Sequence, residues 1–205
     1  MVRYLDPEDH PESGEARREP RLSPAERLAR LRERNAALTG TAAIEGAREV
    51  ALRLLDSRSR STGEIRSAIE LKGFAPEVAE EVIERLARVG LVDDAAFARA
   101  LVADRFRGSG KTGRALVEEM RRKGLDQATI EAAMESIEPE DVRERAAELV
   151  ERKLRSMRGV PRDTAYRRLA GTLARKGYPP SLCSSLVAEA LSAREGAEDG
   201  EGEAY

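Results

Sequence analysis

The chain has one cysteine and one histidine among 205 residues. Cys183 has no second cysteine to pair with, which excludes an intramolecular disulfide framework and a cysteine-rich zinc site. His10 lies in a charged N-terminal stretch, so the body of the chain has no histidine for a Ser-His-Asp triad, a metal cluster or a Cys–His pair. We therefore expect a protein that is not an enzyme and that has no metal or other cofactor.

Aromatic residues and long apolar runs are equally scarce. Phe, Trp and Tyr make up 3% of the chain and Trp is absent, so a core must be built from Leu, Val, Ile and Ala. No apolar run reaches the roughly 18 residues that a membrane span needs, and no apolar segment near the N-terminus is typical of a secretory signal. We predict a soluble, cytoplasmic protein without a membrane partner.

Charge of both signs is abundant, and its distribution is uneven. The 36 basic and 38 acidic residues nearly cancel over the whole chain. Residues 99–123, however, hold eight basic and three acidic residues, and residues 143–176 hold eleven and four. Residues 43–94 and 126–141 are net acidic. The average thus hides two strongly cationic blocks.

Both ends of the chain are polar. Residues 1–42 combine charges of both signs with several prolines, and residues 192–205 are mostly acidic and small. Such compositions are typical of disordered segments, because they offer little apolar surface to bury. Within the first segment, Ser23-Pro24-Ala25-Glu26 has the form of a capping box with proline at the first helical position. It predicts a short helix over about residues 24–35.

A Lys-Gly-apolar tripeptide occurs three times, with its glycine at positions 73, 124 and 177. Apolar residues stand eight and four positions before each glycine and nine and thirteen positions after it, which is helical spacing on both sides. Gly73, Gly124 and Gly177 are therefore predicted helix stops in the left-handed conformation. Each glycine thus separates a pair of predicted helices, and one more amphipathic run precedes each of these helix pairs. Strand patterns are absent. The pattern predicts an all-α protein of three tandem three-helix repeats, over residues 43–93, 94–139 and 140–191.

The segment Gly108-Ser109-Gly110-Lys111-Thr112 contains part of a phosphate-binding P-loop. The complete motif needs a glycine where Arg105 stands, and it follows a strand, whereas this segment follows a predicted helix. We interpret it as a flexible loop between helices.

The basic residues of the two cationic blocks outnumber the acids that could neutralise them. Arg99, Arg105, Arg107 and Lys111 have only Asp104 among them, and the basic residues between positions 155 and 176 have only Asp163. We interpret this surplus as a binding face for an anionic partner, and a face that is merely solvated is the alternative. The candidate binding residues are Arg99, Arg105, Arg107, Lys111, Arg114, Arg121, Arg122, Lys123, Arg152, Lys153, Arg155, Arg158, Arg162, Arg167, Arg168, Arg175 and Lys176.

Several stretches of this sequence, taken together, resemble the RecX family, the bacterial modulators of the RecA recombinase. The most telling one runs from Gly90 to Ala98, and its motif residues are Gly90, Leu91, Asp93, Asp94 and Phe97. The resemblance extends over about residues 44–191. It implies an elongated protein of tandem three-helix repeats, which agrees with the repeat found above, and we expect a gently curved rod.

The resemblance also implies a function. A RecX-like protein would bind in the groove of the RecA–DNA filament and restrain strand exchange, ATP hydrolysis and co-protease activity. The expected partners are the RecA filament and single- and double-stranded DNA without sequence preference, and we expect a monomer. Two other classes stay open: a DNA-binding transcription regulator of the helix-turn-helix type, and a passive helical adaptor whose basic faces pair with its own acids.

Overall fold

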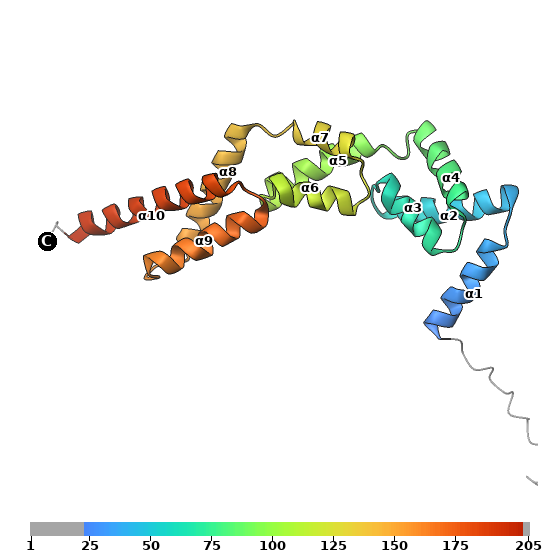
Figure 1. Cartoon of the computed structure of the whole chain (residues 1–205), viewed down its shortest axis with the longest axis horizontal. Coiled ribbons are helices and arrows are strands. Elements are labelled where there is room, and N and C mark those ends of the chain that lie inside the picture. Colours follow the sequence, from blue (N-terminus) through green and yellow to red (C-terminus); the bar gives the residue numbers. More distant parts are fainter. Residues whose placement is uncertain (1–22, 203–205) are drawn as a thin grey trace, which may run out of the picture.

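The computed structural model describes residues 23–202, with residues 197–202 described by their backbone alone. All regular elements in this part of the chain are helical (Figure 1). The elements are α1 (Pro24–Ala36), α2 (Gly40–Ser57), α3 (Thr62–Leu71), α4 (Pro76–Arg88), α5 (Asp94–Asp104), the π-helical turn η2 (Arg105–Ser109), α6 (Gly113–Arg122), α7 (Gln127–Met134), α8 (Pro139–Leu154), α9 (Arg162–Lys176) and α10 (Pro180–Gly202).

The helices form three units, each with its own hydrophobic core. The first unit comprises α2, α3 and α4, the second α5, α6 and α7, and the third α8, α9 and α10. The predicted all-α class with three tandem three-helix repeats is therefore confirmed. The apolar residues eight and four positions before each Lys-Gly glycine are the centre of each core, since all of them are at most 1% exposed: Ile65, Ile69, Leu116, Met120, Leu169 and Leu173.

Each Lys-Gly turn ends the second helix of its unit. Gly73, Gly124 and Gly177 have φ angles of +93°, +74° and +93°, a conformation that favours glycine because glycine lacks a Cβ. After the second and third turns, the amides of Leu125 and Tyr178 donate to carbonyls five residues back, each at 3.3 Å, as in a Schellman motif. The predicted helix stops are present at all three positions.

The same turns also join the units, which the sequence pattern did not predict. The hydroxyl of Ser61, at the start of α3, donates to the carbonyl of Lys123, and the amide of Thr112, at the start of α6, donates to the carbonyl of Lys176 at 2.9 Å. The C-terminal end of one second helix therefore meets the N-terminal end of another, and their dipoles attract. In Figure 1, α9, α6 and α3 follow one another along the lower side of the molecule.

The junctions leave no room for a side chain at the glycines. A Cβ on Gly177 would lie 2.1 Å from the carbonyl oxygen of Thr112, and a Cβ on Gly124 would lie 2.7 Å from the Cα of Gly63. Two backbones thus meet directly at each junction. Glycine is required there for the close approach as well as for its φ angle.

Helix α1 covers the first Lys-Gly turn in a similar way. The Asn35 amide donates to the carbonyl of Lys72 at 2.8 Å, and a Cβ on Gly73 would lie 2.6 Å from the Cα of Arg32. The helix has the capping box expected at Ser23. Residues 40–42 differ from the expectation of disorder, because α2 begins at Gly40 and buries Ala43 and Ala47 on its first turns. Residues 1–22 lie outside the described part.

The C-terminal end also differs from the sequence-based expectation. The composition predicts a disordered tail over residues 192–205, but α10 continues to Gly202. The last leucine of this helix, Leu191, is fully buried, and Glu195 on the next turn forms an ion pair with Arg162 of α9. A helix that is already nucleated gains a hydrogen bond with each added residue, and Ala and Glu favour this extension. Residues 203–205 lie outside the described part.

The three units form an extended arch (Figure 1). The lower, concave side carries the row of second helices, while α8, α7, α5 and α4 lie toward the upper side. None of the helices in residues 23–202 is both long and apolar enough to cross a membrane.

Candidate interface

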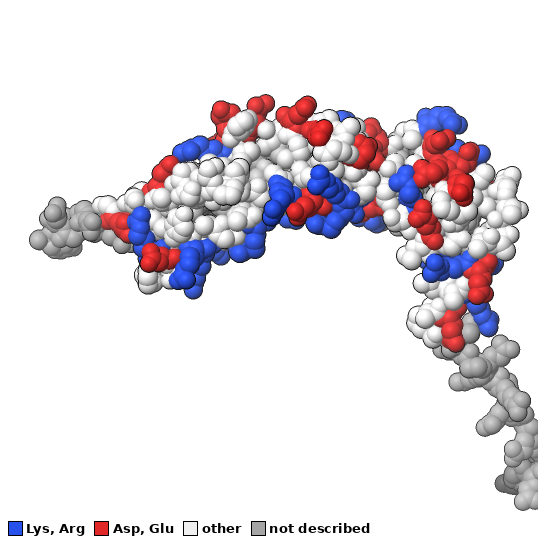
Figure 2. Space-filling model, viewed as in Figure 1, with Lys and Arg blue, Asp and Glu red and all other residues white. Residues whose placement is uncertain are grey.

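Lys and Arg side chains gather along the concave edge of the arch, below α6 and α9, whereas Asp and Glu predominate along the upper edge (Figure 2). The sequence blocks explain this pattern, since α6 and α9 lie in the two basic blocks and α7 lies in the acidic block 126–141. The arch therefore has two faces of opposite charge.

In the second unit, a buried carboxylate neutralises part of the predicted surplus. Glu119 of α6 is only 11% exposed in its side chain and forms ion pairs with Arg105 and Lys111, both at 2.7 Å. Burial raises the pKa of Glu119, but hydrogen bonds from Lys111 and Arg105 outweigh it, and the net pKa is lowered. Arg105 is also paired with Asp104 at 2.5 Å. The interpretation of Arg105 and Lys111 as unneutralised cations was wrong, because the carboxylate of Glu119 on α6 pairs with both of them.

Two of the candidate lysines belong to the junctions. Lys123 lies between units one and two, 3.2 Å from Glu64 and 5.6 Å from the ring centroid of Phe97. Lys176 lies between units two and three and donates to the carbonyl of Ser109. Both ammonium groups are half-buried and hold neighbouring units together.

The electrostatic environment of Lys176 is unusually positive. Burial lowers its pKa, and the nearby charges of Arg152, Lys111 and Arg145 lower it further. The two basic blocks thus converge at this junction.

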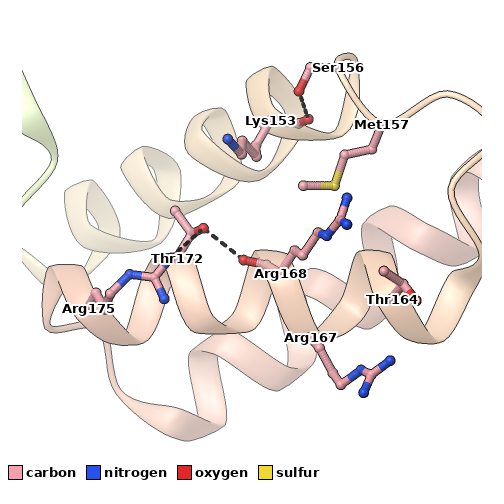
Figure 3. A pocket seen from close by; sticks show the side chains of 8 residues that line it. All are labelled: Lys153, Ser156, Met157, Thr164, Arg167, Arg168, Thr172 and Arg175. Atoms are coloured by element: carbon pink, nitrogen blue, oxygen red, sulfur yellow. Dashed lines mark hydrogen bonds between the residues drawn. The ribbon is translucent and has the colours of Figure 1, made fainter.

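Seven cations of the third unit form no ion pair within the described residues. No carboxylate within the described residues pairs with the following exposed side chains: Arg152, Lys153, Arg155, Arg158, Arg167, Arg168 and Arg175. Some of them line an open groove of about 670 Å³ between α8 and α9 (Figure 3). Arg168 extends from α9 toward Met157, which lies in the turn after α8, and Lys153 lies on α8 above it. Hydroxyl groups of Ser156, Thr164 and Thr172 complete the lining. The hydroxyls of Ser156 and Thr172 already donate to backbone carbonyls within their own helices or turns. The guanidinium and ammonium groups gathered in this groove favour an anionic ligand with several oxygen atoms.

The remaining candidates are scattered over the surface. Arg99 and Arg107 are exposed on α5 and η2. Arg114 pairs with Glu118 at 3.5 Å, Arg121 donates to Gln127 at 2.9 Å, and Arg122 is exposed beside it. Arg162 pairs with Glu195. Of the second unit, only Arg99, Arg107 and Arg122 stay without a side-chain partner among the described residues.

The motif around Gly90 lies at the boundary of the first two units. Asp93 caps α5 by accepting from the amide of Ala96 at 2.8 Å, while Asp94 accepts from the amide and the hydroxyl of Thr62 in the first unit, at 2.8 and 2.6 Å. Leu91 is 52% exposed and Phe97 is half-buried. Asp93 therefore caps a helix, whereas the adjacent Asp94 links the first two units.

The segment 108–112 is more ordered than a flexible loop. The amide of Lys111 donates to the carbonyl of Arg105 at 3.1 Å, and Gly110 packs against Leu149 of the third unit. Because the amide of Thr112 is already engaged at the Lys176 carbonyl, this backbone does not cradle a phosphate. Where side chains are described, no group of three potential ligands could hold a metal ion.

Sequence reasoning missed two sets of residues. Arg145 pairs with Glu148 at 2.6 Å and donates to the carbonyl of Arg107, so it links α8 to η2. The small residues at the starts of α3 and α6, above all Gly63 and Gly113, face the Lys-Gly turns of the next unit. A second glycine ten or eleven positions before the stop glycine was the available signal, and the third unit lacks it.

Three family models match the three units in order. They are described as the first, second and third three-helix domains of RecX, and they match residues 47–86, 93–134 and 140–187. This chain belongs to the RecX family. The family boundaries fall within the three units of the fold, and the resemblance noted in the motif of Gly90 is confirmed.

Curated relatives named Regulatory protein RecX agree with this assignment. The protein of Streptomyces coelicolor is 43% identical over 148 residues, which cover 72% of this chain and 79% of the relative. That of Thermobifida fusca is 41% identical, with 74% and 82% covered. That of Corynebacterium efficiens is 37% identical over 196 residues, with 90% and 93% covered. The RecX relatives are thus named as regulatory proteins.

Two solved RecX structures have the same fold. RecX from Lactobacillus salivarius superposes with a TM-score of 0.63 at 18% identity, over 71% of this chain and 95% of that one. A second structure, of regulatory protein RecX, gives 0.62 at 21% identity, over 80% and 79%. The tandem arrangement of three-helix units is therefore shared with RecX proteins of distant sequence.

Proposed function

We propose that this chain binds the RecA–DNA filament and restrains RecA, with the unneutralised cations of the third unit as its main contact with the filament. The observation that carries the proposal is the set of exposed Arg and Lys side chains on α8 and α9 in a chain of the RecX family. Their ligand would be DNA phosphate or an acidic surface of RecA.

The shape of the arch supports a contact over several subunits of a helical filament. The concave edge is basic and the convex edge is acidic (Figure 2), so the two faces would meet surfaces of opposite sign. The acidic blocks 43–94 and 126–141 would contact basic protein surface. Binding across several protomers would favour one filament geometry and hinder growth, strand exchange, ATP hydrolysis and co-protease activity.

Sequence-specific DNA reading has less support. The helices that follow the Lys-Gly turns take the place of recognition helices, but α4 exposes mainly Glu side chains and α7 has no basic residue. The starts of α3 and α6 are covered by the next unit, so they cannot enter a groove of DNA. A sequence-independent contact with phosphate is therefore the DNA-binding mode that we propose.

The experiment is co-sedimentation with RecA filaments assembled on single-stranded DNA, with DNA alone as a second arm. A triple variant of Arg167, Arg168 and Arg175 to Glu should lose most filament binding and most inhibition of RecA ATPase. The matched control changes Arg48, Arg53 and Arg88 of the first unit to Glu, which alters the net charge equally. Equal inhibition by both triple variants would contradict the assignment of the interface.

The DNA-alone arm separates the two ligands. If phosphate is the ligand, the parent protein should sediment with DNA alone, and log K should fall with log salt by roughly 0.7 to 0.9 per phosphate contact. If the acidic surface of RecA is the ligand, the triple variant should lose filament binding while binding of DNA alone is weak in parent and variant alike.

A further inference from the structure

A second groove lies at the boundary of the first two units, away from the α8–α9 groove. It has a volume of about 720 Å³. Its apolar lining comes from α5 and from the turn before it: Leu91, Ala96, Phe97, Ala100 and Leu101. Leu91 is 52% exposed although it is a large apolar residue. An exposed leucine beside further apolar side chains marks a surface that gains from being covered.

The charged side chains around this groove are almost all basic. Arg58, Arg60, Arg105 and Lys123 line it, and Asp93 is the only acid among its lining residues. Asp93 accepts from the amide of Ala96 and keeps its charge, and Arg105 is already paired with Glu119 and Asp104. The positive excess of the groove therefore comes from Arg58, Arg60 and Lys123. The groove therefore offers apolar surface and positive charge together.

One carboxylate serves three of these cations. Glu64 lies 2.8 Å from Arg58, 3.8 Å from Arg60 and 3.2 Å from Lys123. Three positive charges against one negative charge leave a positive excess at this edge of the groove. A ligand that brings carboxylates would complete the neutralisation.

We propose that this groove binds an acidic peptide segment of a partner protein, with an apolar side chain against Leu91 and Phe97 and flanking carboxylates near Arg58, Arg60 and Lys123. The site goes beyond the proposed function, because a filament contact through α8 and α9 does not require it.

The groove suits a peptide better than a nucleic acid strand. Base stacking needs open aromatic faces, but the only aromatic side chain lining the groove is Phe97. This ring is half-buried and has the ammonium group of Lys123 over one face, at 5.6 Å from its centroid. Leu91, Ala96 and Ala100 offer aliphatic contacts, which suit apolar amino-acid side chains.

The test uses the full chain and a fluorescently labelled peptide, acetyl-Asp-Glu-Leu-Phe-Glu-Asp, in anisotropy titrations. The parent should bind this probe at least tenfold more tightly than a probe in which Leu-Phe is replaced by Ala-Ala. Leu91→Asp should weaken binding of the first probe at least tenfold. Arg58→Glu should weaken it severalfold, with a steeper loss at low salt because the contact is electrostatic.

Val89→Asp is the matched control. Val89 belongs to the same turn, is 68% exposed and does not line the groove, so the added charge is equal and only the location differs. It should bind the probe as the parent does, and both variants should keep the parent's helical circular dichroism. Equal binding by Leu91→Asp and Val89→Asp would overturn the proposal.

Competition separates the classes of ligand and the two grooves. An oligothymidylate of equal charge should fail to displace the peptide, and displacement would mean that the groove is a nucleic-acid site instead. The triple variant of Arg167, Arg168 and Arg175 should bind the peptide normally. Loss of peptide binding in that variant would place the peptide on the α8–α9 groove and overturn the proposal, independently of the outcome with RecA filaments.

Discussion

The basic blocks of the second and third units both have a surplus of basic residues in the sequence but have different structural roles. In the second unit, Glu119 binds Arg105 and Lys111 at 2.7 Å, and the paired groups help to hold η2 against α6. In the third unit, Arg167, Arg168 and their neighbours have no carboxylate partner within the described residues. Net charge along the chain is therefore a poor measure of the charge that is available to a ligand.

The difference arises from one buried acid. Glu119 stands on the face of α6 that turns toward η2, so a residue fourteen positions from Arg105 forms an ion pair with it at 2.7 Å. Between positions 155 and 176 of the third unit the only acid is Asp163. It is exposed in the first turn of α9, where its charge interacts favourably with the positive end of the helix dipole.

Opening the junction between the two units should have the largest effect. Gly177→Ala forces a Cβ to within 2.1 Å of the Thr112 carbonyl oxygen and strains a positive φ angle. We expect the free energy of unfolding to fall by about 3 kcal/mol or more, as measured by urea denaturation.

The control for this substitution is Gly90→Ala. Gly90 also has a positive φ angle, +73°, but no atom lies within 4 Å of an added Cβ. Gly90→Ala should lower the free energy of unfolding by only about 1 kcal/mol, which is the cost of the positive φ angle alone. Equal losses in the two variants would show that close packing at the junction contributes nothing.

Removing the charge of Glu119 should have the next largest effect. Glu119→Gln leaves Arg105 and Lys111 without their shared carboxylate, and we expect a loss of about 1–3 kcal/mol in the free energy of unfolding. Glu118→Gln on the same helix is the control. Its side chain is 52% exposed and pairs only with Arg114, so a change of at most about 0.5 kcal/mol is expected.

The stability supplied by Glu119 should depend on pH. Its pKa is lowered in the folded state, so its contribution is fully present above the ordinary pKa of a glutamate and is lost as pH falls through the lowered value. The difference in unfolding free energy between the parent and Glu119→Gln should therefore shrink between neutral pH and about pH 3. A difference that stays constant over this range would contradict the role of the ionised carboxylate.

The smallest effect on stability is expected in the third unit. Changing Arg167, Arg168 and Arg175 to Ala removes no ion pair, so the free energy of unfolding should change by no more than about 0.5 kcal/mol for each. For DNA binding, the slope of log K against log salt should nevertheless become shallower by roughly 0.7 to 0.9 for each phosphate contact removed. Arg105→Ala should have the opposite pattern. It should clearly lower the free energy of unfolding, because it deprives Glu119 of a partner, and it should change the salt dependence of DNA binding little.

Much of the fold was predictable because it depends on local patterns. The spacing of apolar residues around the three Lys-Gly turns reflects helical periodicity, and glycine is the residue that ends a helix in the left-handed conformation. The order of the three units follows from the repeat. Residues 192–202 were harder to predict, since their polar composition does not reveal that Leu191 and Glu195 anchor the helix to α9.

The candidate interface was only partly predictable. The sequence located both basic blocks, but pairing between Arg105 and Glu119, or between Lys123 and Glu64 at a separation of 59 residues, depends on which helix faces meet. The groove around Leu91 likewise needs α5 to lie beside residues 58–60 of the first unit.

The amino-acid sequence alone determines three helical units, their stops and the position of the two cationic blocks, because backbone periodicity and glycine conformation act over a few residues. The tertiary structure decides that the stops at Gly124 and Gly177 also serve as junctions, and that one basic block is neutralised while the other stays available. Both decisions depend on the close approach of groups far apart in the chain, where backbone contact and short-range ion pairing take effect only after the units have docked.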